Sequence, residues 1–163
     1  MLNKINFLFV TLFGIGKIKK IPGTFASLAT TLFLFFLFHI LNVSTNIVLF
    51  SIIVIFFISL YTVSIFIKDL PNKDPKEIVI DEFIGQSIPI CFYEVAHDMP
   101  KETDQVLKFY FIMFILFRIF DITKPFPASY YDKNFKNSFG VVMDDVCAGL
   151  YVVLALVLYM VFT

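Results

Sequence analysis

The sequence predicts an all-α protein that crosses a membrane several times, as a polytopic helical bundle of about four or five membrane helices. Hydrophobic residues make up 59% of the 163 residues and charged residues only 16%, whereas soluble domains are about 45–50% apolar and about 25% charged. Several apolar runs are long enough to cross a bilayer. No internal repeat or linker divides the chain, so residues 1–163 are expected to form a single domain.

The overall charge and the cysteines exclude several classes of function. The formal net charge is zero, so the chain has no long-range field that would attract nucleic acid. Cys91 and Cys147 both fall within apolar runs, where a thiol usually acts as a small hydrophobic side chain rather than as half of a disulfide or a metal ligand. No segment indicates an obligate protein partner.

The N-terminal region changes from apolar to basic. Residues 1–13 are mostly apolar and are expected to form a short helix at the membrane interface. Glycines and three lysines follow, and Pro22 predicts a turn with Thr24 as the N-cap of the next helix. Such a loop at a helix N-terminus can hold a phosphate, although a capped helix beside interfacial lysines produces the same pattern. The candidate phosphate-binding residues are Gly23, Thr24 and Ser27.

Five apolar stretches are candidate membrane helices. Four of them are residues 25–41, 47–67, 106–122 and 146–162, and the second contains no charge. The remaining stretch, residues 83–96, is short and contains a glycine, a glutamine, a proline and a glutamate. It could cross the membrane, kink, re-enter or lie buried among the other helices, and the sequence leaves these alternatives open.

Acidic residues precede the short stretch. If a helix starts after Pro75, Glu77 and Asp81 share one face at a spacing of four, and two like charges there repel unless a cation binds between them. Acidic residues at a helix start also interact favourably with the helix dipole, which is the alternative explanation. That alternative fits Asp81 and Glu82 less well, because an apolar run begins directly behind them.

A second group of charges ends the stretch 106–122. Arg118 and Asp121 are three residues apart and share a helix face, and Lys124 follows just before Pro125. A charge deep in a bilayer costs on the order of 2.5–3.5 kcal/mol, so such groups usually have a function. The alternative is a salt bridge with a long side chain that reaches the membrane interface.

Adjacent aspartates, Asp144 and Asp145, precede the last apolar stretch, and capping of a helix dipole would need only one of them.

With five crossings, eleven lysines and arginines fall on one side of the membrane and two, Lys101 and Lys108, on the other. The positive-inside rule places the richer side in the cytoplasm. The sequence segments that converge on that side are then residues 14–27, 77–82, 118–124 and 144–145.

This convergence predicts metal-assisted chemistry on an anionic headgroup. Carboxylates are hard oxygen ligands that suit Mg²⁺, and Arg118 and Lys124 can bind phosphate oxygens. The candidate catalytic residues are Asp81, Glu82, Asp121, Asp144 and Asp145. The candidate metal ligands are Glu77, Asp81, Asp121 and Asp145. A site at the interface suits a phospholipid, with its acyl tails in the bilayer and its phosphate at the acidic residues.

Four blocks of the sequence resemble the phosphatidylglycerophosphatase A family and occur in the family's order. They are the glycine-containing loop of residues 14–27, the E-IV-DE-G block of residues 77–85, the FR-FD-KP-P block of residues 117–127 and the DD-AG block of residues 144–149. Ala26 departs from the pattern, because the family often has glycine there. The resemblance covers nearly the whole chain.

The resemblance implies a Mg²⁺-dependent phosphatase of the inner membrane, with its active site facing the cytoplasm. It would remove the terminal phosphate of phosphatidylglycerophosphate to give phosphatidylglycerol and phosphate. The alternative from a different class is a non-enzymatic carrier or ion pathway that uses the acidic residues as a relay. Transporters usually place such groups near the middle of the membrane, whereas here they gather at one interface.

Overall fold

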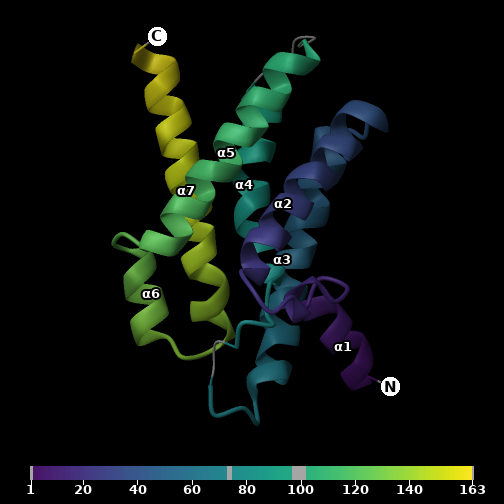
Figure 1. The fold of residues 1–163 in the computed structure, drawn as a ribbon, viewed down its shortest axis with the longest axis vertical. Helices are drawn as coiled ribbons and strands as arrows, with labels where there is room; N and C mark the ends of the chain where they lie inside the picture. The colour runs from purple at the N-terminus through teal and green to yellow at the C-terminus, as the bar shows by residue number, and fades with distance from the viewer. Residues whose placement is uncertain (1, 73–74, 97–101, 163) are drawn as a thin grey trace.

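The computed structural model describes residues 2–72, 75–96 and 102–162, and these residues form helices and turns with no strand (Figure 1). The elements are α1 (Leu2–Val10), η1 (Ile15–Lys17), α2 (Pro22–Phe35), η2 (Phe36–Ile40), α3 (Thr45–Ile67), α4 (Ile80–Ala96), α5 (Thr103–Thr123), α6 (Ala128–Asn134) and α7 (Ser138–Phe162). The all-α prediction is therefore confirmed. Lys101, which the sequence was expected to place on the opposite side of the membrane, lies outside the described residues.

Within the described residues, three helical segments are long and apolar enough to cross a membrane: Pro22–Ile40, α3 and α7. The 23 residues of α3 extend about 34 Å, which exceeds the hydrocarbon thickness of about 30 Å. Large apolar side chains stand exposed along α3, among them Phe50 and Phe57. A bilayer is the medium that accommodates such a surface, so the chain is a membrane protein. The expected number of four or five membrane helices also counted residues 83–96 and 106–122, which lie in α4 and α5.

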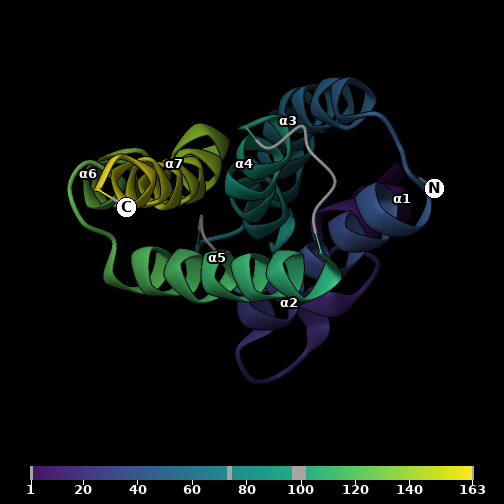
Figure 2. The same ribbon diagram turned by 90° about the horizontal axis from the view of Figure 1, so that it is seen from above.

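Helix α4 lies in the middle of the bundle and contacts α2, α3, α5 and α7 (Figure 2). Most of its side chains are buried, including Gln86 and Ser87. Its 17 residues would extend about 26 Å. Of the alternatives that the sequence left open for residues 83–96, the structure has one continuous helix, with Pro89 in its interior, surrounded by the other helices.

Two glycines allow α4 and α7 to pack closely. A Cβ at Gly149 would overlap the backbone oxygen of Gly85, and a Cβ at Gly85 would lie 2.6 Å from the backbone oxygen of Asp145. In a regular helix the oxygen of Gly85 would accept a bond from the N–H of residue 89, and Pro89 has none. Pro89 therefore removes the helical hydrogen bond to the same oxygen that Gly149 approaches.

Helix α2 begins three residues earlier than the sequence predicted, and the prediction of Thr24 as its N-cap is wrong. Ile21 occupies the cap position in a left-handed conformation, and Pro22 is the first helical residue. Proline suits this place because its fixed φ is helical and the first N–H groups have no partner in the helix. The N–H of Thr24 donates to the oxygen of Ile21 over 3.1 Å.

The expected helical pairing of Glu77 with Asp81 is also wrong, because α4 begins only at Ile80. The N–H of Val79 donates to the oxygen of Val10 over 3.0 Å, which ties this segment to the end of α1. A Cβ at Gly16 would overlap the backbone oxygen of Glu77. Residues 76 and 77 therefore form a turn held against the N-terminal loop rather than the start of a helix.

Candidate metal and phosphate site

Three carboxylates from two helices meet at one end of the bundle. Asp81 and Glu82 come from the first turn of α4 and Asp145 comes from α7, and one ligand oxygen from each lies within 4.8 Å of the others. We call these three residues the acidic cluster. Asp81 and Asp145 are buried. Like charges at this separation repel strongly unless a cation or a proton compensates them.

The close packing of α4 and α7 explains how the acidic cluster forms. Asp81 lies four residues before Gly85, and Asp145 lies four residues before Gly149. Both helices run upward in Figure 1 from the end where α1 and α6 lie. Each aspartate is therefore about one turn below the glycine contact, on two backbones that the glycines hold together.

Capping of the helix dipole does not explain the paired aspartates. Helix α7 begins at Ser138, not at Val146, so Asp144 and Asp145 are its seventh and eighth residues. The dipole acts mainly within the first turn. Each aspartate has a different environment instead: Asp145 belongs to the acidic cluster and Asp144 pairs with a lysine.

Lys124 connects α5, α6 and α7 through two carboxylates. Its ammonium lies 2.5 Å from Asp144 Oδ2 and 3.0 Å from Asp132 Oδ1. Burial lowers the pKa of Lys124, but its hydrogen bonds and attraction to Asp144 and Asp132 outweigh this and raise the pKa above its usual value. Lys124 therefore remains a cation at neutral pH. Its backbone is left-handed and closes the last turn of α5.

Arg118 is held by neighbours on both sides. Its Nη1 lies 2.5 Å from Asp121 Oδ2, as the spacing of three predicted, and 3.4 Å from the hydroxyl of Ser27. That hydroxyl donates to the oxygen of Gly23 over 2.8 Å. The Nε of Arg118 is buried without a hydrogen-bond partner. Asp121 thus neutralises the guanidinium and does not belong to the acidic cluster.

Gly23 brings the start of α2 against the acidic cluster. A Cβ at this position would overlap Glu82 Oε1 and would lie 3.3 Å from Arg118 Nη1. Only a residue without a side chain leaves room for both groups. The glycine that the sequence suggested for phosphate binding therefore also determines where the Glu82 carboxylate lies.

A polar cavity of about 360 Å³ contains these groups. Its lining includes nine of the predicted site residues: Gly23, Thr24, Asp81, Glu82, Arg118, Asp121, Lys124, Asp144 and Asp145. Ser27 does not line the cavity and reaches it only through Arg118. Glu77 is exposed and is part neither of the lining nor of the acidic cluster, so the structure does not bring it to the other expected metal ligands.

Sequence reasoning missed three polar residues near this site. Lys76 lines the cavity, and Asp132 pairs with Lys124. Gln86 lies one turn beyond Glu82, and its amide is buried without a hydrogen-bond partner. An amide within an otherwise apolar run was a signal that could have found Gln86. No sequence spacing would have paired Asp132 with Lys124, because that pairing depends on how α6 folds back.

The acidic cluster fits a hard divalent cation. Glu82 Oε2 is buried without a hydrogen-bond partner. Burial, together with the nearby charge of Asp121, raises the pKa of Glu82 to about 7, although Asp81 and Arg118 act in the opposite direction. A bound cation would remove this cost, because it favours the ionised carboxylate. Three carboxylates without nitrogen or sulfur ligands are typical of Mg²⁺ and similar ions.

Comparisons with known proteins agree with the motifs. The family model described as Phosphatidylglycerophosphatase A matches residues 8–160. A protein named Phosphatidylglycerophosphatase A from Haemophilus influenzae is 36% identical over 154 residues, which cover 94% of this chain and 87% of the relative. One of the same name from Escherichia coli is 31% identical over 139 residues, covering 85% of this chain and 73% of the relative. No solved structure matches. The chain belongs to the phosphatidylglycerophosphatase A family.

Proposed function

We propose that this chain is a Mg²⁺-dependent phosphatase that hydrolyses the terminal phosphate monoester of phosphatidylglycerophosphate. Water and the substrate would give phosphatidylglycerol and inorganic phosphate. The names of the relatives support the reaction. The observation that carries the proposal is that three carboxylates and two cationic side chains, from α4, α5 and α7, share one polar cavity.

Asp81, Glu82 and Asp145 would hold the cation, because among the described residues only their carboxylate oxygens approach one another closely enough. When bound, Mg²⁺ supplies charge stabilisation for a phosphoryl group. We assign Glu77 no part in this, because it lies outside the cavity.

Arg118 and Lys124 would bind phosphate oxygens, the first as a planar fork and the second as a point charge. Asp121 and Asp144 would orient these two cations, each through a contact of 2.5 Å. Gly23 and Thr24, in the first turn of α2, would add the favourable potential of a helix N-terminus. Together these residues neutralise and position the phosphate while the acidic cluster holds the metal.

The charge distribution along the chain supports a cytoplasmic site in the inner membrane. The polar cavity lies at the end of the bundle where most of the lysines and arginines fall, which the positive-inside rule assigns to the cytoplasm. The substrate headgroup would enter there while its acyl chains stay in the bilayer. Residues 1–163 would act as one domain, because every wall of the cavity comes from the same bundle.

The test is phosphate release from phosphatidylglycerophosphate in mixed micelles by the purified protein. We expect activity with Mg²⁺, none in excess chelator, and recovery when Mg²⁺ is restored. Asp81→Asn and Asp145→Asn should each abolish turnover. Asp104→Asn is the matched control, because Asp104 is an exposed aspartate in the first turn of α5 and lies outside the cavity.

Two results would contradict the proposal. Full activity in chelator would rule out the metal, and absence of phosphate release from well-folded protein would favour the carrier alternative. Near-normal turnover in Asp81→Asn or Asp145→Asn would remove that residue from the metal site.

A further inference from the structure

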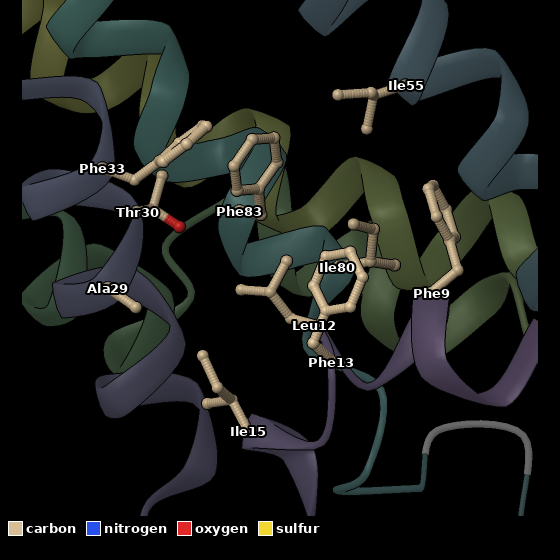
Figure 3. Close-up of a pocket in the computed structure, with 10 residues that line it drawn as sticks. All are labelled: Phe9, Leu12, Phe13, Ile15, Ala29, Thr30, Phe33, Ile55, Ile80 and Phe83. Carbon is tan, nitrogen blue, oxygen red and sulfur yellow. The ribbon is translucent and has the colours of Figure 1, made fainter. Parts of the chain in front are cut away.

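A second cavity lies beside the polar one and is almost entirely apolar. It measures about 530 Å³ and is lined by Phe9, Leu12, Phe13, Ile15, Ala29, Thr30, Phe33, Ile55, Ile80 and Phe83 (Figure 3). A further apolar cavity of about 290 Å³ shares Phe33, Ile55 and Phe83 with it. We call the two together the apolar groove, which lies between α2 and α3 with α4 at its base.

The dimensions and lining of the groove suit a single hydrocarbon chain. On α2 and η2 it extends from Ala29 to Leu37, eight residues or about 12 Å. One leaflet of a bilayer has a hydrocarbon depth of about 15 Å, half of the whole core. Its lining includes two hydroxyl groups, and each already donates to a backbone oxygen over 2.8 Å, Thr30 to Ala26 and Ser51 to Ile47. The groove therefore offers apolar surface to a ligand.

The groove and the polar cavity lie on opposite sides of the first turn of α4. Ile80 and Phe83 face the groove, whereas Asp81 and Glu82 face the polar cavity. Glu82 packs directly on the backbone of Gly23, so α2 and α4 leave no passage for a chain at that point. A lipid whose phosphate lies at the acidic cluster could not place its acyl chain in the groove through this contact.

Basic residues lie at the end of the groove nearest the N-terminal loop. Ile15 lines the groove and belongs to the same short turn as Lys17, whose ammonium lies 4.7 Å from the centre of the Phe7 ring. Lys17 is exposed, and so is Lys20 in the same loop, whereas Lys19 lines the polar cavity. An apolar groove that ends at exposed lysines is complementary to a lipid with an anionic headgroup.

We propose that the apolar groove holds one acyl chain of an anionic bilayer phospholipid, distinct from the substrate, with its headgroup at Lys17 and Lys20. The chain packs against Ile80 and Phe83 and so supports, from behind, the turn of α4 that carries Asp81 and Glu82. This binding does not depend on the proposed phosphatase activity.

Fluorescence quenching tests the site, because the chain contains no tryptophan. Phe33→Trp places a reporter in the groove, and Phe57→Trp places a control on the exposed face of α3. Each protein is reconstituted in phosphatidylcholine vesicles with a small fraction of phosphatidylglycerol carrying brominated chains. We expect the brominated lipid to be enriched about five-fold at the Phe33 position over the Phe57 position. This corresponds to about 1 kcal/mol for one lysine–headgroup contact.

Two substitutions separate the parts of the site. Ala29→Phe fills the groove and should abolish the enrichment, whereas Leu32→Phe, on the exposed face of α2, should leave it unchanged. Should Ala29→Phe fail to fold, Lys17→Gln combined with Lys20→Gln tests the headgroup contact, and it should reduce the enrichment to that of brominated phosphatidylcholine.

The other outcomes would overturn the proposal. Equal quenching at the two reporters would mean that the groove binds no lipid selectively, and equal enrichment of brominated phosphatidylcholine would exclude an anionic headgroup. Loss of the enrichment in Asp145→Asn would assign the chain to a lipid bound in the polar cavity. A protein that releases no phosphate but shows selective quenching would contradict the proposed function and support this site.

Discussion

Substitution of Gly23 by alanine tests the geometry of the acidic cluster. The new Cβ would overlap Glu82 Oε1, which is the end of a flexible side chain and can move. Gly23 is the second residue of α2 and is helical, where alanine is the better helix former by up to about 1 kcal/mol. We therefore expect the free energy of unfolding to be unchanged or higher, while the Glu82 carboxylate is displaced from the cluster.

The expected functional loss is large. Groups that support a metal site typically change metal affinity or activity about 10- to 100-fold, and loss of a stabilising charge costs about 10²–10³ in turnover. We expect the Mg²⁺ concentration for half-maximal phosphate release to rise at least about ten-fold in Gly23→Ala. The assay is a Mg²⁺ titration of phosphate release, with thermal unfolding in detergent measured on the same samples.

A second substitution provides an internal control. Glu82→Asp shortens the side chain that meets the new Cβ, so Gly23→Ala combined with Glu82→Asp should lose less activity than the two single effects predict. Coupling of this kind is expected only for residues in contact. A wild-type Mg²⁺ requirement in Gly23→Ala would refute the reasoning, because it would show that the carboxylate need not lie against α2.

The remaining predictions concern helix packing and the two cations. Gly85→Ala would place a Cβ 2.6 Å from the backbone oxygen of Asp145. Because the backbone cannot move aside as a side chain can, the free energy of unfolding should fall by about 1–3 kcal/mol. The measurement is a lower thermal midpoint. Lys124→Ala should raise KM or lower kcat, whereas Lys108→Ala, at the far end of α5, should match wild type; an unchanged kcat/KM in the first variant would reject phosphate binding. Asp121→Asn should abolish turnover with folding retained, because Arg118 loses its ionic partner; near-normal turnover would reject its role.

The motif residues were predictable from the sequence, and most of them meet in the structure. Charges within an apolar chain are expensive and therefore few, so Asp81, Arg118, Lys124 and Asp145 stood out before any fold was known. The spacing of three between Arg118 and Asp121 predicted that both lie on one helix face, and the salt bridge that they form is the alternative that the sequence left open.

The division of the carboxylates into metal ligands and ion-pair partners was decided by tertiary structure. Glu77 was expected to share a helix face with Asp81. Instead the N–H of Val79 donates to the oxygen of Val10, α4 begins only at Ile80, and Glu77 is exposed. Asp144 and Asp145 are adjacent in sequence but have different neighbours. The end of α5 brings Lys124 to Asp144, whereas α4 brings Asp81 to Asp145.

The sequence by itself determined that this chain is helical, lies in a membrane and has its charges concentrated in a few short segments, because composition and helical spacing are properties of the chain alone. Which helix faces which was decided only by the fold. Gly85 and Gly149 permit a contact between backbones, and Gly23 permits Glu82 to approach α2. Periodicity shows which side chains share a face, but the neighbour that covers that face depends on packing across the whole bundle.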